Sequence, residues 1–169
     1  MQGDIIMALK TDRSTLQTDI SFFMNEAATR GGVACLSTGG SGSAMDQGEA
    51  LVTYAALPSG KVPVGLLIND MVDVDLLRQS VNQHKDEVQK GTKVTLLQKG
   101  YAVTNSLEGT SPSAGDPAYV AHSGNISVTD LSNDDSDDDG STRLVGRFLS
   151  GVDQDGYAKV FIDLPNTNV

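Results

Sequence analysis

The aspartates crowded into one short stretch are the residues best able to bind a metal ion. Asp135, Asp137 and Asp139 begin a D-x-D-x-D-G sequence, which is how an EF-hand calcium loop starts. That loop needs a bidentate glutamate at its twelfth position, where this chain has Gly146. The flanking residues also lack a helical pattern. We therefore reject an EF-hand and expect a solvated acidic loop at residues 130–140, with weak calcium binding as the alternative.

Candidate nucleophiles and bases are few. The chain has one cysteine, Cys35, and two histidines, His84 and His122. A Cys35–His122 or Ser–His catalytic pair stays open as an alternative, but no spacing favours it. Two histidines and one cysteine, far apart in the sequence, also make a weak case for a zinc site. The GGSGS tract at residues 39–43 lacks the strand–turn–helix setting of a nucleophile elbow. We expect Cys35 to be a small buried hydrophobe, and we predict no catalytic residue, no metal site and no cofactor.

The charge balance argues against a nucleic-acid partner. Lys and Arg number 12 against 22 Asp and Glu, so the 169 residues carry a net charge of −10. Six of the aspartates fall within residues 130–139, and without them the net charge is −4. No basic stripe is present that could displace counterions from phosphates. No signal peptide is recognisable, and no apolar run approaches the ~20 residues of a membrane helix. We expect a soluble protein made in a cytoplasm, without a nucleic-acid or membrane partner.

The clearest structural signal is a pair of strands within residues 143–165. Alternate residues of the second strand fall on two faces: Ala158, Val160, Ile162 and Leu164 on one, and Tyr157, Lys159, Phe161 and Asp163 on the other. Asp155-Gly156 supplies the turn, so a hairpin explains the nearby Asp153 better than a metal site does. Gly146 and Gly151 interrupt the first strand and predict a bulge or a close backbone approach.

Short strands are expected along most of the chain. They lie at residues 18–25 and 33–36, within 50–57 and 62–75, in a hairpin at 93–104 that turns at Lys99-Gly100, and at 118–122 paired with 126–129. We expect an N-terminal arm at residues 1–20, a β domain at 21–169, and a loop with a helical turn at 76–89. The pattern predicts an all-β fold: an antiparallel β-sandwich or barrel, jelly-roll-like, with an extended N-terminal arm and little helix.

Several stretches together resemble a known family. They are FFMNEAATRGGVA (22–34), VPVGLLINDMVDVDL (62–76), KDEVQKGTKVTLLQKGYAVTN (85–105), GDPAYVAHSGNI (115–126) and VGRFLSGVDQDGYAKVFIDLP (145–165). These stretches resemble capsid decoration, or cement, proteins of tailed bacteriophages, particularly those infecting cyanobacteria and related hosts. The likeness covers residues 22–165 and rests on overall pattern and turn placement. Residues 134–140 look like a local insertion relative to that pattern.

The resemblance implies a structural virion protein that is not an enzyme. Such a protein would be assembled in the host cytoplasm, bind the exterior of an icosahedral capsid and clamp adjacent major capsid protein subunits against DNA pressure. We expect a homotrimer. An irregular arm can add a strand to a neighbour's sheet edge, gaining main-chain hydrogen bonds. The residues predicted to contact the capsid or another subunit are Ile5, Ile6, Leu9, Leu16, Phe22 and Phe23.

Two alternatives come from other functional classes. A host- or glycan-binding head-fibre or tail-associated β module is suggested by the polar residues 76–89 and the Gly/Ser tract. Against it, the chain has no Trp and only 5% aromatic residues, whereas sugar sites usually stack rings on aromatic side chains. A small hydrolase that uses Cys35 or a serine is the other alternative.

Overall fold

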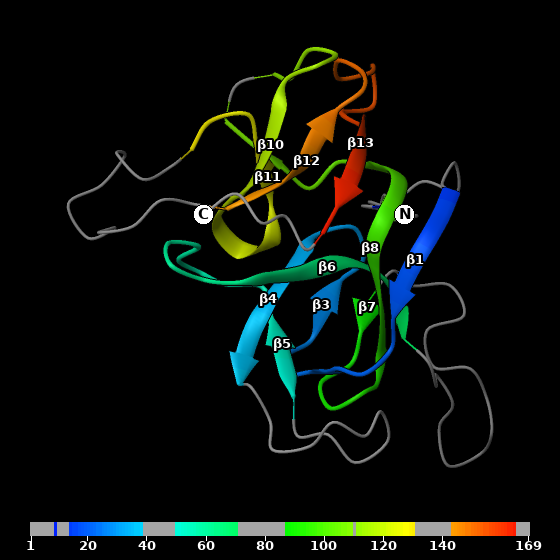
Figure 1. Cartoon of the computed structure of the whole chain (residues 1–169), viewed down its shortest axis with the longest axis vertical. Coiled ribbons are helices and arrows are strands. Elements are labelled where there is room, and N and C mark those ends of the chain that lie inside the picture. The colour runs from blue at the N-terminus through cyan, green and yellow to red at the C-terminus, as the bar shows by residue number, and fades with distance from the viewer. Residues whose placement is uncertain are drawn as a thin grey trace, which may run out of the picture.

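Strand β8, Val94–Thr104, is the element to which three other strands are hydrogen-bonded (Figure 1). The computed structural model describes residue 9 and residues 14–38, 50–70, 87–109, 111–130 and 143–164. Within these ranges the chain is almost entirely β-structure, with one short 3-10 turn, η1, at His122–Gly124. The predicted all-β sandwich is confirmed.

The remaining strands are short. They are β1 (Ser14–Asp19), β2 (Phe23–Met24), β3 (Ala28–Thr29), β4 (Val33–Thr38), β5 (Leu51–Thr53), β6 (Pro63–Asp70), β7 (Glu87–Val88), β9 (Leu107–Glu108), β10 (Pro117–Val120), β11 (Ile126–Ser127), β12 (Leu144–Phe148) and β13 (Ala158–Asp163). The large sheet has the order β2-β5-β4-β6-β8-β13-β12-β10-β11-β9, and β1 joins it at β8. Strands β3 and β7 form a separate two-stranded sheet.

Both edges of β8 are paired. Strand β6 pairs with the first half of β8, residues 94–97, and β13 pairs with residues 99–104. Strand β1 pairs with residues 96–101 of β8, a stretch that overlaps both the part paired with β6 and the part paired with β13. Because each strand has only two edges, β6 and β13 share one edge and β1 occupies the other. The sheet therefore has two halves, β4–β6 and β13–β12–β10, joined through β8.

The two halves of the sheet are buried differently. The main core lies between them and contains side chains such as Leu66 of β6, Leu97 of β8 and Ile162 of β13. A second core covers the opposite face of the β4–β6 half, where Leu67 and Leu96 pack with residues from β2 and the β3–β7 sheet. Neighbours in sequence thus enter different cores, which is the period-two geometry of a strand buried on both faces.

The predicted C-terminal hairpin is confirmed. Strands β12 and β13 pair antiparallel, and the turn at Asp155-Gly156 has Gly156 at φ +86°. The Asp153 carboxylate accepts hydrogen bonds from the backbone N–H groups of Asp155 and Tyr157, at 3.0 and 2.8 Å. The face of β13 that begins with Ala158 and continues with every second residue packs in the main core, as its apolar side chains predict. Tyr157, on the predicted opposite side, is also buried.

The predicted hairpin at residues 93–104 is wrong, because β8 runs straight through Lys99-Gly100. Gly100 has φ +144°, and it lies where the register with β1 shifts between Thr15 and Gln17. A Cβ on Gly100 would lie 2.2 Å from the Ser14 carbonyl oxygen. The glycine therefore marks a bulge with a close backbone approach, which the sequence pattern cannot distinguish from a turn.

The predicted single strand at residues 18–25 is also wrong. Strand β1 ends at Asp19 and β2 starts at Phe23. The backbone N–H of Ser21 donates to the Asp19 carboxylate at 2.7 Å, which turns the chain between them. Strand β1 thus lies within residues 1–20, the segment predicted to be an arm. Residues 39–49, 71–86 and 131–142 lie outside the described residues, and with them the Gly/Ser tract, His84 and most of the acidic loop.

Gly146 allows β12 and β13 to approach closely. A Cβ there would lie 1.8 Å from the backbone oxygen of Phe161, so Gly146→Ala has to displace one strand. We expect a loss of roughly 1–3 kcal/mol in unfolding free energy, measured by urea denaturation. Gly151→Ala is the matched control, because a Cβ there would lie 3.4 Å from its nearest neighbour, the Pro112 backbone oxygen. It should shift the unfolding free energy by less than about 0.5 kcal/mol. Equal stability of the two variants would contradict the close backbone approach at Gly146.

Candidate functional site

Cys35 and His122, the candidates for nucleophilic chemistry, both occupy positions that stabilise the fold. Cys35 is fully buried in the main core, and burial raises the pKa of its thiol to about 12, although the Lys61 charge and a backbone hydrogen bond at Ala55 act in the opposite direction. His122 Nδ1 lies 2.8 Å from Glu108 Oε1, and its backbone N–H donates to Glu108 Oε2 at 3.0 Å. The histidine thereby fastens the η1 turn to β9.

The described ranges contain no group of three or more His, Cys, Asp and Glu residues that could hold a metal ion. None of the helical segments in the same ranges is long and apolar enough to cross a membrane. The aspartate run at residues 134–140 lies outside these ranges.

One sheet face stays open to solvent, and we call it the outer face. It is the side of the β8–β13–β12–β10 half that points away from the main core, and the described residues do not cover it. Its side chains are Lys99, Tyr101, Pro117, Arg147, Lys159, Phe161 and Asp163, all exposed or half-buried. The β4–β6 half has no comparable face, because the second core covers it.

Strand register lines up a row of residues across the outer face. Tyr101 of β8 lies opposite Phe161 of β13, Phe161 opposite Arg147 of β12, and Arg147 opposite Pro117 of β10. On the other edge of β8, Ser14 of β1 lies opposite Tyr101. Since directly opposed side chains share one face, the row extends across five strands. The resulting surface is continuous from the β1 edge to β10.

The outer face combines aromatic rings with charge. The rings of Tyr101 and Phe161 have centroids 5.3 Å apart with an interplanar angle of 50°, and Lys159 Nζ lies 5.3 Å from the Tyr101 centroid. Lys99 Nζ lies 3.6 Å from Asp163 Oδ1. These groups are partly exposed, so the ion pair adds little stability. Aromatic residues and arginine are enriched at protein interfaces, which makes this face a candidate for binding another protein.

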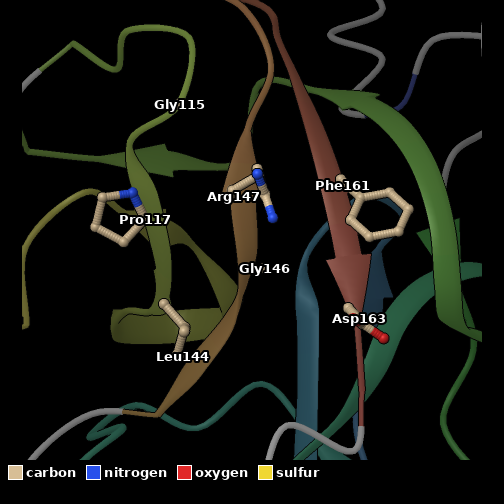
Figure 2. A pocket seen from close by; sticks show the side chains of 7 residues that line it. All are labelled: Gly115, Pro117, Leu144, Gly146, Arg147, Phe161 and Asp163. Atoms are coloured by element: carbon tan, nitrogen blue, oxygen red, sulfur yellow. The ribbon is translucent and has the colours of Figure 1, made fainter.

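A hollow of about 360 Å³ lies on the outer face (Figure 2). It is lined by Gly115, Pro117, Leu144, Gly146, Arg147, Phe161 and Asp163. In Figure 2, Arg147 stands between Pro117 of β10 and Phe161 of β13. A Cβ on Gly146 would lie 1.8 Å from the Phe161 backbone oxygen, so this residue lines the hollow with its backbone alone. The hollow is open to solvent and has both apolar and charged walls.

Strand β1 is an exposed edge strand. Residues 14–18 are exposed, and Leu16 has 65% of its surface accessible. Among the described residues, β8 is the only strand that pairs with β1, so its other edge presents main-chain donors and acceptors. Such edges readily pair with another chain. The β1 edge and the outer face together form the candidate docking surface.

The predicted contact residues lie in different surroundings. Leu9 is buried in the main core and bridges to Thr104, and Phe22 packs against the second core. Leu16 is exposed on β1, and Phe23 is half-buried with Lys93 Nζ 5.6 Å from its ring centroid. Ile5 and Ile6 lie outside the described residues. The part that these six residues play in contacts stays a prediction.

Sequence reasoning did not single out the outer face. The signal was present in β13, where Lys159, Phe161 and Asp163 alternate with the core residues. No comparable sequence pattern singles out Tyr101 and Arg147, because only strand pairing brings them beside Phe161. The pairing of Tyr101 with Phe161 joins β8 to β13, two strands far apart in the sequence, and a local pattern does not encode such a pairing.

Comparison with known families identifies the chain's relatives. A family model described as structural cement protein (E217 gp24/Pam3 gp6) matches residues 8–163. The chain belongs to this phage structural cement protein family. No curated protein matches the sequence significantly. The cement family's description is structural, which points to a non-catalytic role, a place on the phage capsid and binding to capsid proteins.

Cys35 should be inert in the folded protein. Its pKa of about 12, against an ordinary value of 9.0, leaves the thiolate roughly a thousandfold scarcer at pH 8. We expect iodoacetamide to label the native protein at least about a hundredfold more slowly than the urea-unfolded chain, as followed by mass spectrometry. The chain has a single cysteine, so any label reports on this site. Rapid stoichiometric labelling of native protein would revive the hydrolase alternative.

Proposed function

We propose that this cement protein binds the outer surface of the icosahedral capsid and clamps adjacent major capsid protein subunits. In this way it stabilises the head against the pressure of packaged DNA. The observation that carries the proposal is an open sheet face that continues into an exposed edge strand, in a chain that belongs to a structural cement family. The Arg and aromatic side chains of the outer face suit a protein partner.

The β1 edge suits strand addition from a capsid subunit. A partner strand beside β1 would gain main-chain hydrogen bonds on its inner side, while Leu16 would lose exposed apolar surface. The outer face could meet a second subunit, since it runs from the β1 edge across β8 to β10. Two contacts from one rigid domain would hold the subunits together.

Oligomerisation would strengthen the clamp. As a homotrimer, the protein would present three docking surfaces at once, and each bound copy would raise the effective concentration of the others. We further propose that it is assembled onto the head in the host cytoplasm, without contacting nucleic acid or membrane. Its net charge of −10 agrees with a position away from packaged DNA.

Leu16→Asp should weaken capsid binding. The substitution places a charge where the proposal buries an exposed leucine, so we expect binding to fall by about tenfold or more. The measurement is co-sedimentation of purified protein with capsids from a mutant phage that lacks it. Point substitution is cleaner than removing residues 1–20, because Leu9 belongs to the main core.

Leu57→Asp is the matched control for this experiment. Leu57 is also an exposed leucine, with 54% of its surface accessible, but it follows β5 in the other half of the sheet. Both variants should keep the unfolding midpoint of the native protein. Equal capsid binding by Leu16→Asp and the native protein would remove β1 from the docking surface.

Copy number tests the proposed function independently of any mutation. A lattice cement protein should be present in a fixed simple ratio to the major capsid protein. Quantitative mass spectrometry of purified virions measures that ratio. A handful of copies per particle would instead place the protein at the tail or at a vertex fibre.

A further inference from the structure

We propose that the hollow around Arg147 is a carboxylate-binding pocket that receives an acidic side chain of the major capsid protein. This inference rests on the proposed function and names the chemistry by which the outer face would recognise its partner. Arg147 is the residue assigned to bind the carboxylate. Pro117, Leu144 and Phe161 supply the apolar walls.

The position of Arg147 favours a ligand over an internal partner. Its side chain is exposed, and within the described ranges it makes no hydrogen bond or ion pair. Asp163 of β13 is the carboxylate that lines the hollow, and its Oδ1 atom lies 3.6 Å from Lys99 Nζ. The Arg147 guanidinium therefore keeps its donors available for another molecule. A guanidinium binds a carboxylate through two parallel hydrogen bonds, which are stronger than those between neutral groups.

The walls of the hollow would strengthen such a pair. Pro117 and Phe161 lie directly opposite Arg147 on the two neighbouring strands, so apolar surface flanks the charge on both sides. When a partner covers the hollow, these walls exclude water and lower the local dielectric, which increases the attraction between opposite charges. Gly115 adds no side chain, and no atom of the described residues lies within 4 Å of where its Cβ would be, which leaves room for the incoming carboxylate.

The charge of the outer face indicates which partner fits. The face carries three cations, Lys99, Arg147 and Lys159, and one anion, Asp163, on a chain with a net charge of −10. An acidic patch on the capsid would complement this local excess of two positive charges and orient the protein as it approaches. In a two-fold self-association the same face would meet itself, and the two cationic patches would repel. A capsid subunit is thus favoured over a second copy.

Charge reversal at Arg147 tests the pocket. Capsids from a mutant phage lacking the protein are mixed with the native protein, Arg147→Glu, Arg147→Lys or Arg143→Glu. Arg147→Glu should weaken binding at least about tenfold, and Arg147→Lys should weaken it less, because the charge stays while the two-pronged geometry is lost. Arg143→Glu is the control: it makes the same change in net charge at an exposed residue outside the hollow, and it should bind like the native protein.

Crosslinking identifies the occupant. A carbodiimide joins amines to carboxylates that touch them, so the Arg147→Lys protein bound to capsids should form an amide between position 147 and an acidic residue of the major capsid protein. Mass spectrometry of the digested particles reads the crosslinked peptides. Coupling from position 147 only to Asp163, or only to a second copy of the chain, would overturn the proposal.

The outcomes separate the pocket from the cement function. If the native protein binds capsids and Arg147→Glu binds equally well, the pocket is wrong while the cement function stands. If the native protein itself fails to bind, the proposed function fails. Circular dichroism and the unfolding midpoint verify that each variant is folded. A weakened Arg147→Glu with a normal midpoint, together with normal Arg143→Glu, supports the carboxylate pocket.

Discussion

Backbone hydrogen bonding along both edges of β8 is the constraint on which the rest of the structure depends. One edge carries β6 and β13 in succession, and the other carries β1. Buried main-chain groups have to be paired, and β8 is long enough to pair with two strands end to end. This arrangement brings the two halves of the sheet face to face and encloses the main core. The sandwich exists because one strand belongs to both halves.

The candidate docking surface follows from an asymmetry in how the two halves of the sheet are covered. The β4–β6 half is buried on both sides by the main core and the second core. The other half has only its inner side buried, so Tyr101, Arg147 and Phe161 face outward. A cement protein needs a rigid surface that can be occupied by another protein without unfolding. A sheet with one packed face and one open face provides it.

Much of the fold could be predicted where the pattern was local. The alternation from Ala158 to Leu164 predicts a strand with one buried face, and Asp155-Gly156 predicts its turn. The prediction failed at Gly100, where a bulge in a continuous strand has the same residue type as a hairpin turn. Whether a glycine of this kind turns the chain or admits a neighbouring backbone depends on the strand beside it, here β1, and not on its own flanking residues.

The sequence alone determined the β class, the C-terminal hairpin and the family, because each rests on residue types and spacing within short stretches or across the whole chain. Tertiary structure decided which side chains share a surface. It placed Leu9 in the core while leaving Leu16 exposed, although both were candidates for contact. It also set Tyr101, Phe161 and Arg147 in one row. Register between strands distant in sequence is fixed by cooperative packing and hydrogen bonding, so no local pattern could have shown that row.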